Sequence, residues 1–262
     1  MVVINTRIVN GGGLTDKEKD EFNWFASLIS NNSFYCGGVY IGNKTILTAA
    51  HCISNIIPDR VRMGYFAPND PKNNLKYYNV VSTKIHPNYD PNTVNRDIGY
   101  ILLEQDPATN GFTPIPILNK GRDKRLKLTE VGKPCVIMGF GRLSLNSSSP
   151  SQLQKTEIFF QDQANSLYPA RYITPRMLLA GDENDPNDPN DNEDSCQGDS
   201  GGPLVAWDPR KKRWNLVGLV SWGNGCALDG YPGVYTKVQT LIGFIVRNTG
   251  VKPNGNGYTF TN

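Results

Sequence analysis

The chain has 262 residues and a formal net charge of +3, with 38% hydrophobic and 10% aromatic residues, a composition that excludes bulk disorder. No run of 18 apolar residues occurs, which excludes a membrane-spanning helix. The mild charge, without Lys/Arg blocks interleaved with aromatics, argues against nucleic-acid binding.

Short β-branched and aromatic segments, bounded by Gly, Pro or Asn, run through the chain. In chain order these predicted strands are 39–41, 45–49, 80–85, 97–103, 135–139 and 216–222. Many short strands separated by turn signals favour an all-β sandwich or barrel. Near the end, apolar residues at helical spacing from Val238 to Val246 predict one helix, which Gly250 would stop.

Two further stretches suggest how the chain is organised. The segment 114–125 carries two prolines and then a Gly/Lys/Arg-rich part, which is typical of a linker between two halves. The run 182–194 holds seven acidic residues and no basic one, so we expect a surface loop there.

One Gly-rich turn offers a nucleophile. Residues 198–203 read Gly-Asp-Ser-Gly-Gly-Pro. A Ser hydroxyl becomes a strong nucleophile when a His takes its proton and a carboxylate orients that His. Backbone N–H groups of a tight Gly turn could stabilise the oxyanion that develops. By composition alone, an ordinary loop remains the alternative, since these residues all favour turns.

The chain has two histidines. His51 lies in the Thr-Ala-Ala-His-Cys segment 48–52, where we expect the end of a strand. His86, in Ile-His-Pro-Asn-Tyr, is interpreted as structural. A structural role is also the alternative for His51 taken by itself.

Together, six segments make the chain resemble the chymotrypsin/trypsin family of serine proteases from Ile8 to about Asn248. They occur in the family's order: RIVNGG at 7–12, TAAHC at 48–52, RDIG at 96–99, DSCQGDSGGP at 194–203, VSWG at 220–223 and PGVYTKV at 232–238. The resemblance implies an all-β fold of two six-stranded antiparallel barrels with a C-terminal α-helix, and an active site in the cleft between barrels. It divides the chain into an activation-peptide remnant 1–7, barrel halves 8–118 and 119–236, a helix 237–249 and a flexible tail 250–262.

The same resemblance implies catalytic roles. Ser200 would be the nucleophile, His51 the general base and then acid, and Asp97 the carboxylate that orients His51. The backbone N–H groups of Gly198 and Ser200 would form the oxyanion hole. The implied function is a secreted trypsin-like endopeptidase that works through an acyl-enzyme.

Specificity is implied by position. Asp194 lies six residues before Ser200, where trypsin-like members hold the carboxylate that pairs with a substrate Arg or Lys. The other substrate-binding positions implied are Ser195, Gln197, Ser221, Trp222, Gly223 and Gly233. Among them, Ser221 and Gly223 would pair with the substrate backbone. The alternative for Asp194 is that it merely ends the acidic run.

Activation is implied in the same way. Cleavage between Arg7 and Ile8 would free an α-amino group that pairs with Asp199, so the chain as written would be a proenzyme. Because the bond follows an Arg, we hypothesise that the protein can activate itself.

Five cysteines leave one unpaired. The resemblance implies bridges Cys36–Cys52 and Cys196–Cys226, and leaves Cys135 as a free buried thiol. An intermolecular bridge at Cys135 is the alternative.

No cofactor is expected. The stretch 63–78, which matches the family's calcium loop, has one acidic residue, Asp70, so we expect no metal there. The run 182–194 could bind Ca²⁺, but a solvated loop that attracts basic substrates is the favoured interpretation.

The expected partners are protein or peptide substrates with Arg or Lys, and protein inhibitors; we expect no nucleic acid, no membrane and a monomer. Secretion is expected although residues 1–7 are too short for a signal peptide. The alternative function is a catalytically silent or narrowly gated homologue that acts by binding a protein partner.

Overall fold

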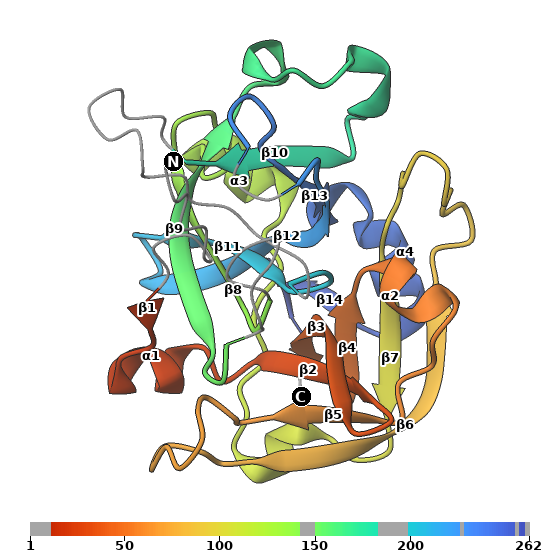
Figure 1. Cartoon of the computed structure of the whole chain (residues 1–262), viewed down its shortest axis with the longest axis vertical. Coiled ribbons are helices and arrows are strands. Elements are labelled where there is room, and N and C mark those ends of the chain that lie inside the picture. The colour runs from red at the N-terminus through yellow and green to blue at the C-terminus, as the bar shows by residue number, and fades with distance from the viewer. Residues whose placement is uncertain (1–11, 142–149, 183–198, 226–227, 255–256, 260–262) are drawn as a thin grey trace, which may run out of the picture.

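The computed structural model describes residues 12–141, 150–182, 199–225, 228–254 and 257–259. Its first barrel is a closed ring of six antiparallel strands in the order β2-β3-β4-β7-β6-β5. The strands are β2 Phe25–Ser30, β3 Ser33–Gly42, β4 Thr45–Thr48, β5 Arg60–Met63, β6 Lys76–Ile85 and β7 Gly99–Leu103. Figure 1 shows this barrel in the lower part of the molecule.

The second barrel lies above the first in Figure 1. Its strands are β8 Pro134–Gly139, β9 Gln154–Gln161, β10 Met177–Gly181, β11 Pro203–Asp208, β12 Arg213–Trp222 and β13 Gly233–Lys237. Strand β8 pairs with both β9 and β11, which closes the ring, and β1 Gly12–Gly13 adds to β9 from outside. The predicted two-barrel fold is therefore confirmed.

Local sequence explains the first hairpin. Asn43 and Lys44 connect β3 to β4 with positive φ angles of 46° and 60°. Two such residues suit a type I′ turn, whose twist matches that of the strands it joins, and Asn is among the residues that favour it. Each predicted strand overlaps an observed one, although β7 begins at Gly99 rather than at Asp97.

The short helices were not predicted. They are α1 Asp16–Glu21, α2 Ala50–Ser54 and α3 Lys120–Leu126, with 3₁₀ turns at Pro107–Asn110, Gln163–Asn165, Ala170–Tyr172 and Val238–Thr240. Elements of five to seven residues are too short to show a helical period. The predicted linker 114–125 does join the barrels, but it carries most of α3 and Leu118 N donates to Leu216 O at 3.0 Å.

A C-terminal helix is confirmed as α4 Ile242–Thr249, and it ends at Gly250 with a φ of 76°. It begins later than the predicted 237–249, because Lys237 ends β13 and Val238–Thr240 form a 3₁₀ turn. It follows β13 of the second barrel in sequence but packs on the first. The Phe244 ring lies 5.0 Å from His86 and 5.9 Å from Tyr100 between ring centroids. Figure 1 shows α4 beside β7.

Beyond α4, the chain forms a hairpin of β14 Lys252–Asn254 and β15 Gly257–Thr259, within the expected tail. Over the described ranges, none of the helices has the length and hydropathy needed to cross a bilayer.

Candidate active site

His51 and Asp97 are joined by two hydrogen bonds. His51 Nδ1 lies 2.8 Å from Asp97 Oδ2, and the His51 backbone N–H donates to Asp97 Oδ1 at 2.9 Å. His51 stands in the first turn of α2, which follows β4 closely. The prediction that it lies at the end of a strand is therefore wrong, because the strand ends at Thr48 and a short helix begins at Ala50. The backbone bond ties the start of that helix to Asp97, which fixes the imidazole relative to the carboxylate.

The Asp97 carboxylate is fully buried. Ser221 on β12 donates from Oγ to Asp97 Oδ2 at 2.6 Å, and Thr236 on β13 donates from Oγ1 to the Asp97 carbonyl at 2.7 Å. A buried carboxylate is tolerated when hydrogen bonds replace its hydration. Because these donors belong to the second barrel, Asp97 is held by both barrels at their junction.

Ser200 lies on a turn wedged between the barrels. Gly37 N on β3 donates to Ser200 O at 2.8 Å, and Gly201 N donates to Val220 O at 2.8 Å. Gly201 has a φ of 75°, and a Cβ there would lie 2.2 Å from Thr48 Oγ1. Only glycine fits, and its lack of a side chain lets the turn approach the segment just before His51.

The structure therefore brings the Ser200 turn against the His51 segment. Within the described ranges, no hydrogen bond joins the Ser200 hydroxyl to the His51 imidazole. Such bonds are often long before a substrate binds.

The Asp199 carboxylate is buried beside Ser200. It accepts a hydrogen bond from Gly141 N at 2.8 Å. A Cβ on Gly139 or Gly141 would lie 1.9 Å or 2.3 Å from its oxygens, so the 139–141 segment leaves room for this group alone. The proposed partner, the amino group of Ile8, and the preceding Arg7 lie outside the described residues.

Several predicted site residues also fall outside that part of the chain: Asp194, Ser195, Cys196, Gln197, Gly198 and Cys226. The pocket floor, one oxyanion donor and the second bridge thus remain predictions. The other substrate-binding positions are described. Ser221 and Trp222 end β12, Gly223 follows them, and Gly233 begins β13.

A cavity of about 500 Å³ lies beside Trp222 and Gly223. Its wall includes Tyr168 and Tyr231, whose ring centroids are 5.2 Å apart, and Tyr168 also stacks edge-on against Trp222 at 5.1 Å. Residues Asn92, Thr93 and Val94 of the first half close the other side. The two tyrosines were not predicted from sequence, because they stand in irregular segments outside every recognised motif.

The predicted Cys36–Cys52 bridge is present and ties β3 to α2, next to His51, with the Cα atoms 6.2 Å apart. Cys135 is a buried free thiol, as predicted. Burial raises the pKa of this thiol well above its usual range.

Cys36, His51 and Cys52 gather within 4.8 Å. The bridged sulfurs offer no thiolate, so this cluster is not a metal site. At the expected position of the calcium loop, Lys19 Nζ lies 2.7 Å from Asp70 Oδ2, and this hydrogen bond lowers the Asp70 pKa. The ammonium of α1 thus neutralises the one carboxylate of that stretch.

Comparison with known proteins agrees with this geometry. The family model described as Trypsin matches residues 12–245. Trypsin I-P1 of Gallus gallus is 36% identical over 83% of this chain and 81% of its own length, and Trypsin of Sus scrofa is 34% identical over 83% and 86%. Protein masquerade of Drosophila melanogaster is 31% identical over 91% of this chain, which spans only 23% of that protein.

Proposed function

Because the chain belongs to the trypsin family of serine proteases, we propose that it is a secreted endopeptidase that cleaves after Arg or Lys. One observation carries the proposal. The buried Asp97 carboxylate holds His51 Nδ1, while the Ser200 turn packs against the strand end just before His51. This arrangement supports the roles proposed for Asp97, His51 and Ser200 in nucleophilic catalysis.

In the proposed reaction, Ser200 Oγ attacks the scissile carbonyl carbon while His51 Nε2 takes the hydroxyl proton. Asp97 keeps the other ring nitrogen protonated and stabilises the imidazolium. The tetrahedral oxyanion accepts hydrogen bonds from the N–H groups of Ser200 and Gly198. When it collapses, His51 gives its proton to the leaving amine, and an acyl-Ser200 ester forms. Water, deprotonated by His51, then hydrolyses that ester and restores Ser200.

Specificity for a cationic side chain is proposed to come from Asp194. Gly223 supports an open slot for the substrate. Among the described residues, a Cβ on Gly223 would meet Gly225 O at 3.7 Å and Tyr168 Oη at 3.9 Å, so their packing does not require a glycine there. We infer that its lack of a side chain serves the substrate. The aromatic cavity beside Trp222 would take an apolar side chain of the bound segment.

Activation is proposed to follow cleavage between Arg7 and Ile8, with the new amino group pairing with Asp199. The buried Asp199 carboxylate next to Ser200 supports this role, because ordering it would order the oxyanion donors. Trypsin-like proteases need no cofactor, and the proposed mechanism uses none.

The test uses matched Arg, Lys and Phe chromogenic peptides before and after a trace of trypsin that is then removed. We expect Arg and Lys cleavage only after nicking, and its loss in Ser200→Ala. Incubation without trypsin, followed by N-terminal sequencing, tests self-activation: a retained Met1 would exclude it.

A second candidate function is a silent or gated homologue that binds a protein partner. Its starting point is that no Ser200–His51 hydrogen bond forms within the described ranges; under the first proposal, a bound substrate would bring these two side chains together. No hydrolysis of any peptide, despite a confirmed Ile8 terminus, would establish this alternative over the first.

A further inference from the structure

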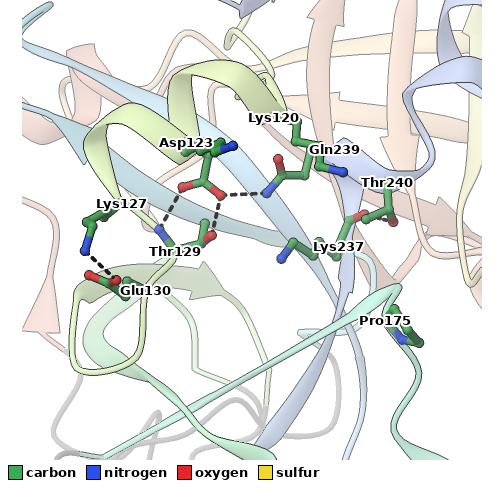
Figure 2. Close-up of a pocket in the computed structure, with 10 residues that line it drawn as sticks. Lys120, Asp123, Lys127, Thr129, Glu130, Pro175, Lys237, Gln239 and Thr240 are labelled. Atoms are coloured by element: carbon green, nitrogen blue, oxygen red, sulfur yellow. Dashed lines mark hydrogen bonds and ion pairs between the residues drawn. The ribbon is translucent and has the colours of Figure 1, made fainter.

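A second cavity, of about 570 Å³, lies in the second half of the chain. Its wall is formed by α3, the loop that follows it, Pro175, and the end of β13 with the next 3₁₀ turn. Figure 2 shows these elements around the open space. None of the predicted catalytic or substrate-binding residues lines it. Its size is that of a small-molecule site.

Positive charge dominates the lining. The cavity is bordered by four lysines, Lys120, Lys124, Lys127 and Lys237, and by two carboxylates, Asp123 and Glu130. Glu130 Oε1 is engaged by Lys127 Nζ at 2.9 Å. Among the described residues, Lys120, Lys124 and Lys237 have no side-chain partner. Figure 2 shows Lys237 extending into the space between α3 and the segment that carries Pro175.

The second carboxylate, Asp123, is hydrogen-bonded to the scaffold. Asp123 accepts hydrogen bonds from Thr129 N at 3.0 Å, from Thr129 Oγ1 at 2.5 Å and from Gln239 Nε2 at 2.8 Å. These bonds join α3, the loop after it and the 3₁₀ turn into one wall, as Figure 2 shows. The wall is therefore preorganised. Asp123 keeps its negative charge, but the four lysines still outnumber the two carboxylates of the lining.

Thr129, Gln239 and Thr240 also border the cavity. Thr129 and Gln239 already donate to Asp123, and Thr240 donates to the Lys237 carbonyl. The lysines are therefore the groups that would donate to a bound anion. A neighbouring cavity of about 410 Å³ shares Thr129, Pro175 and Lys237 with the first, so the two cavities adjoin.

We propose that this lysine pocket binds the sulfate or phosphate groups of a compact polyanion. Each ammonium group supplies a charge and three donors, which suits oxyanions with several acceptor oxygens. Three lysines around one cavity fit a ligand that carries several sulfate or phosphate groups better than they fit a ligand with a single carboxylate. The inference is independent of catalysis, so it stands even if the chain is a silent homologue.

The test is titration calorimetry of the full chain at low ionic strength with two probes, sucrose octasulfate and inorganic tripolyphosphate. The pocket variant is Lys120→Gln/Lys124→Gln/Lys237→Gln. We expect the better probe to lose about 10-fold or more in affinity in this variant, since the three charges that would contact it are removed. Binding of the sugar sulfate alone would assign a sulfated glycan, and equal binding of tripolyphosphate would assign oxyanions in general.

The matched control is Lys76→Gln/Lys211→Gln/Lys212→Gln, which removes the same charge from exposed lysines outside the pocket. We expect it to bind as the parent does. Equal losses in both triple variants would mean diffuse attraction and would overturn the proposal. It would also be overturned if neither probe bound, or if a hexaglutamate peptide bound better than both. Thermal unfolding of each variant checks that the fold is retained.

Discussion

The backbone N–H of Gly37 donates a 2.8 Å hydrogen bond to the carbonyl oxygen of Ser200. This bond joins β3 of the first barrel to the turn that carries the proposed nucleophile in the second. A Cβ on Gly37 would lie 2.8 Å from the Gly202 Cα atom, closer than real contacts allow. The nucleophile's position thus depends on the absence of one side chain in the other barrel.

Gly37→Ala is therefore expected to displace the Ser200 turn. A shift of about 1 Å is enough to reduce the rate about 100-fold, so we expect a loss of that size in kcat/KM for an Arg peptide. Gly243→Ala is the matched control, because its Cβ would approach only the Arg247 guanidinium at 3.9 Å. If Gly37→Ala kept both the activity and the melting temperature of the parent, the position of Ser200 would not depend on the missing side chain at Gly37.

Asp97→Asn tests the orienting carboxylate. The amide would place a donor opposite His51 Nδ1, which favours the wrong tautomer. We expect kcat to fall about 10⁴-fold with little change in KM, the size known for this change in the family's triad. Steady-state kinetics measures both constants, and circular dichroism confirms folding. A loss below about 10-fold would mean that Asp97 does not act through His51.

Tyr168→Ala tests the aromatic cavity. Its ring packs on both Trp222 and Tyr231, and its hydroxyl accepts from Asn224 N at 2.9 Å. We expect KM to rise about 10-fold for peptides with an apolar residue in the segment that pairs with β12, and little for those with Gly there. Tyr168→Phe is the control that keeps the ring. An equal rise for both peptide sets would argue against a side-chain subsite.

Asp70→Asn tests the Lys19 ion pair. Because the folded-state pKa of Asp70 is lowered by Lys19, the stabilisation is present above the unfolded pKa. It is lost as the pH falls through the lower folded pKa. At pH 7 we expect the variant to lose about 1 kcal/mol, or about 2–4 °C in Tm. The difference should disappear in strong acid.

Asp20→Asn provides the comparison for that experiment. Asp20 pairs with Lys72 at 3.1 Å, but its side chain is 69% exposed, so we expect almost no change in Tm. Equal effects of Asp70→Asn and Asp20→Asn would show that the Lys19 pair is an ordinary surface contact.

Thiol counting tests the cysteine assignment. Cys135 is buried, and its thiol pKa is raised by burial, so the native protein should not react with a disulfide reagent. Denaturation without reductant should expose one thiol. Three thiols would mean that Cys196 and Cys226 are not bridged.

The separated motifs indicated the fold, because the fold requires particular residue types at particular positions and each motif contains such residues. Gly201 is an example: its positive φ and its close approach to Thr48 require glycine, so the requirement is visible as a residue type. The proposed triad residues were predicted in the same way. The helices α1, α2 and α3 were not identifiable, since one or two turns leave no periodic pattern.

Other features depend on contacts between distant segments. Tyr168 and Tyr231 are unremarkable in sequence, and only the folded chain stacks them beside Trp222. Lys237 is separated from α3 by more than a hundred residues and meets it across the lysine pocket. The sequence by itself determined the two-barrel family and its proposed chemistry, because those need particular residue types at particular turns. Only the tertiary structure decided the two cavities proposed as a subsite and as an anion site, because ordinary side chains form a cavity wall only when folding makes them neighbours.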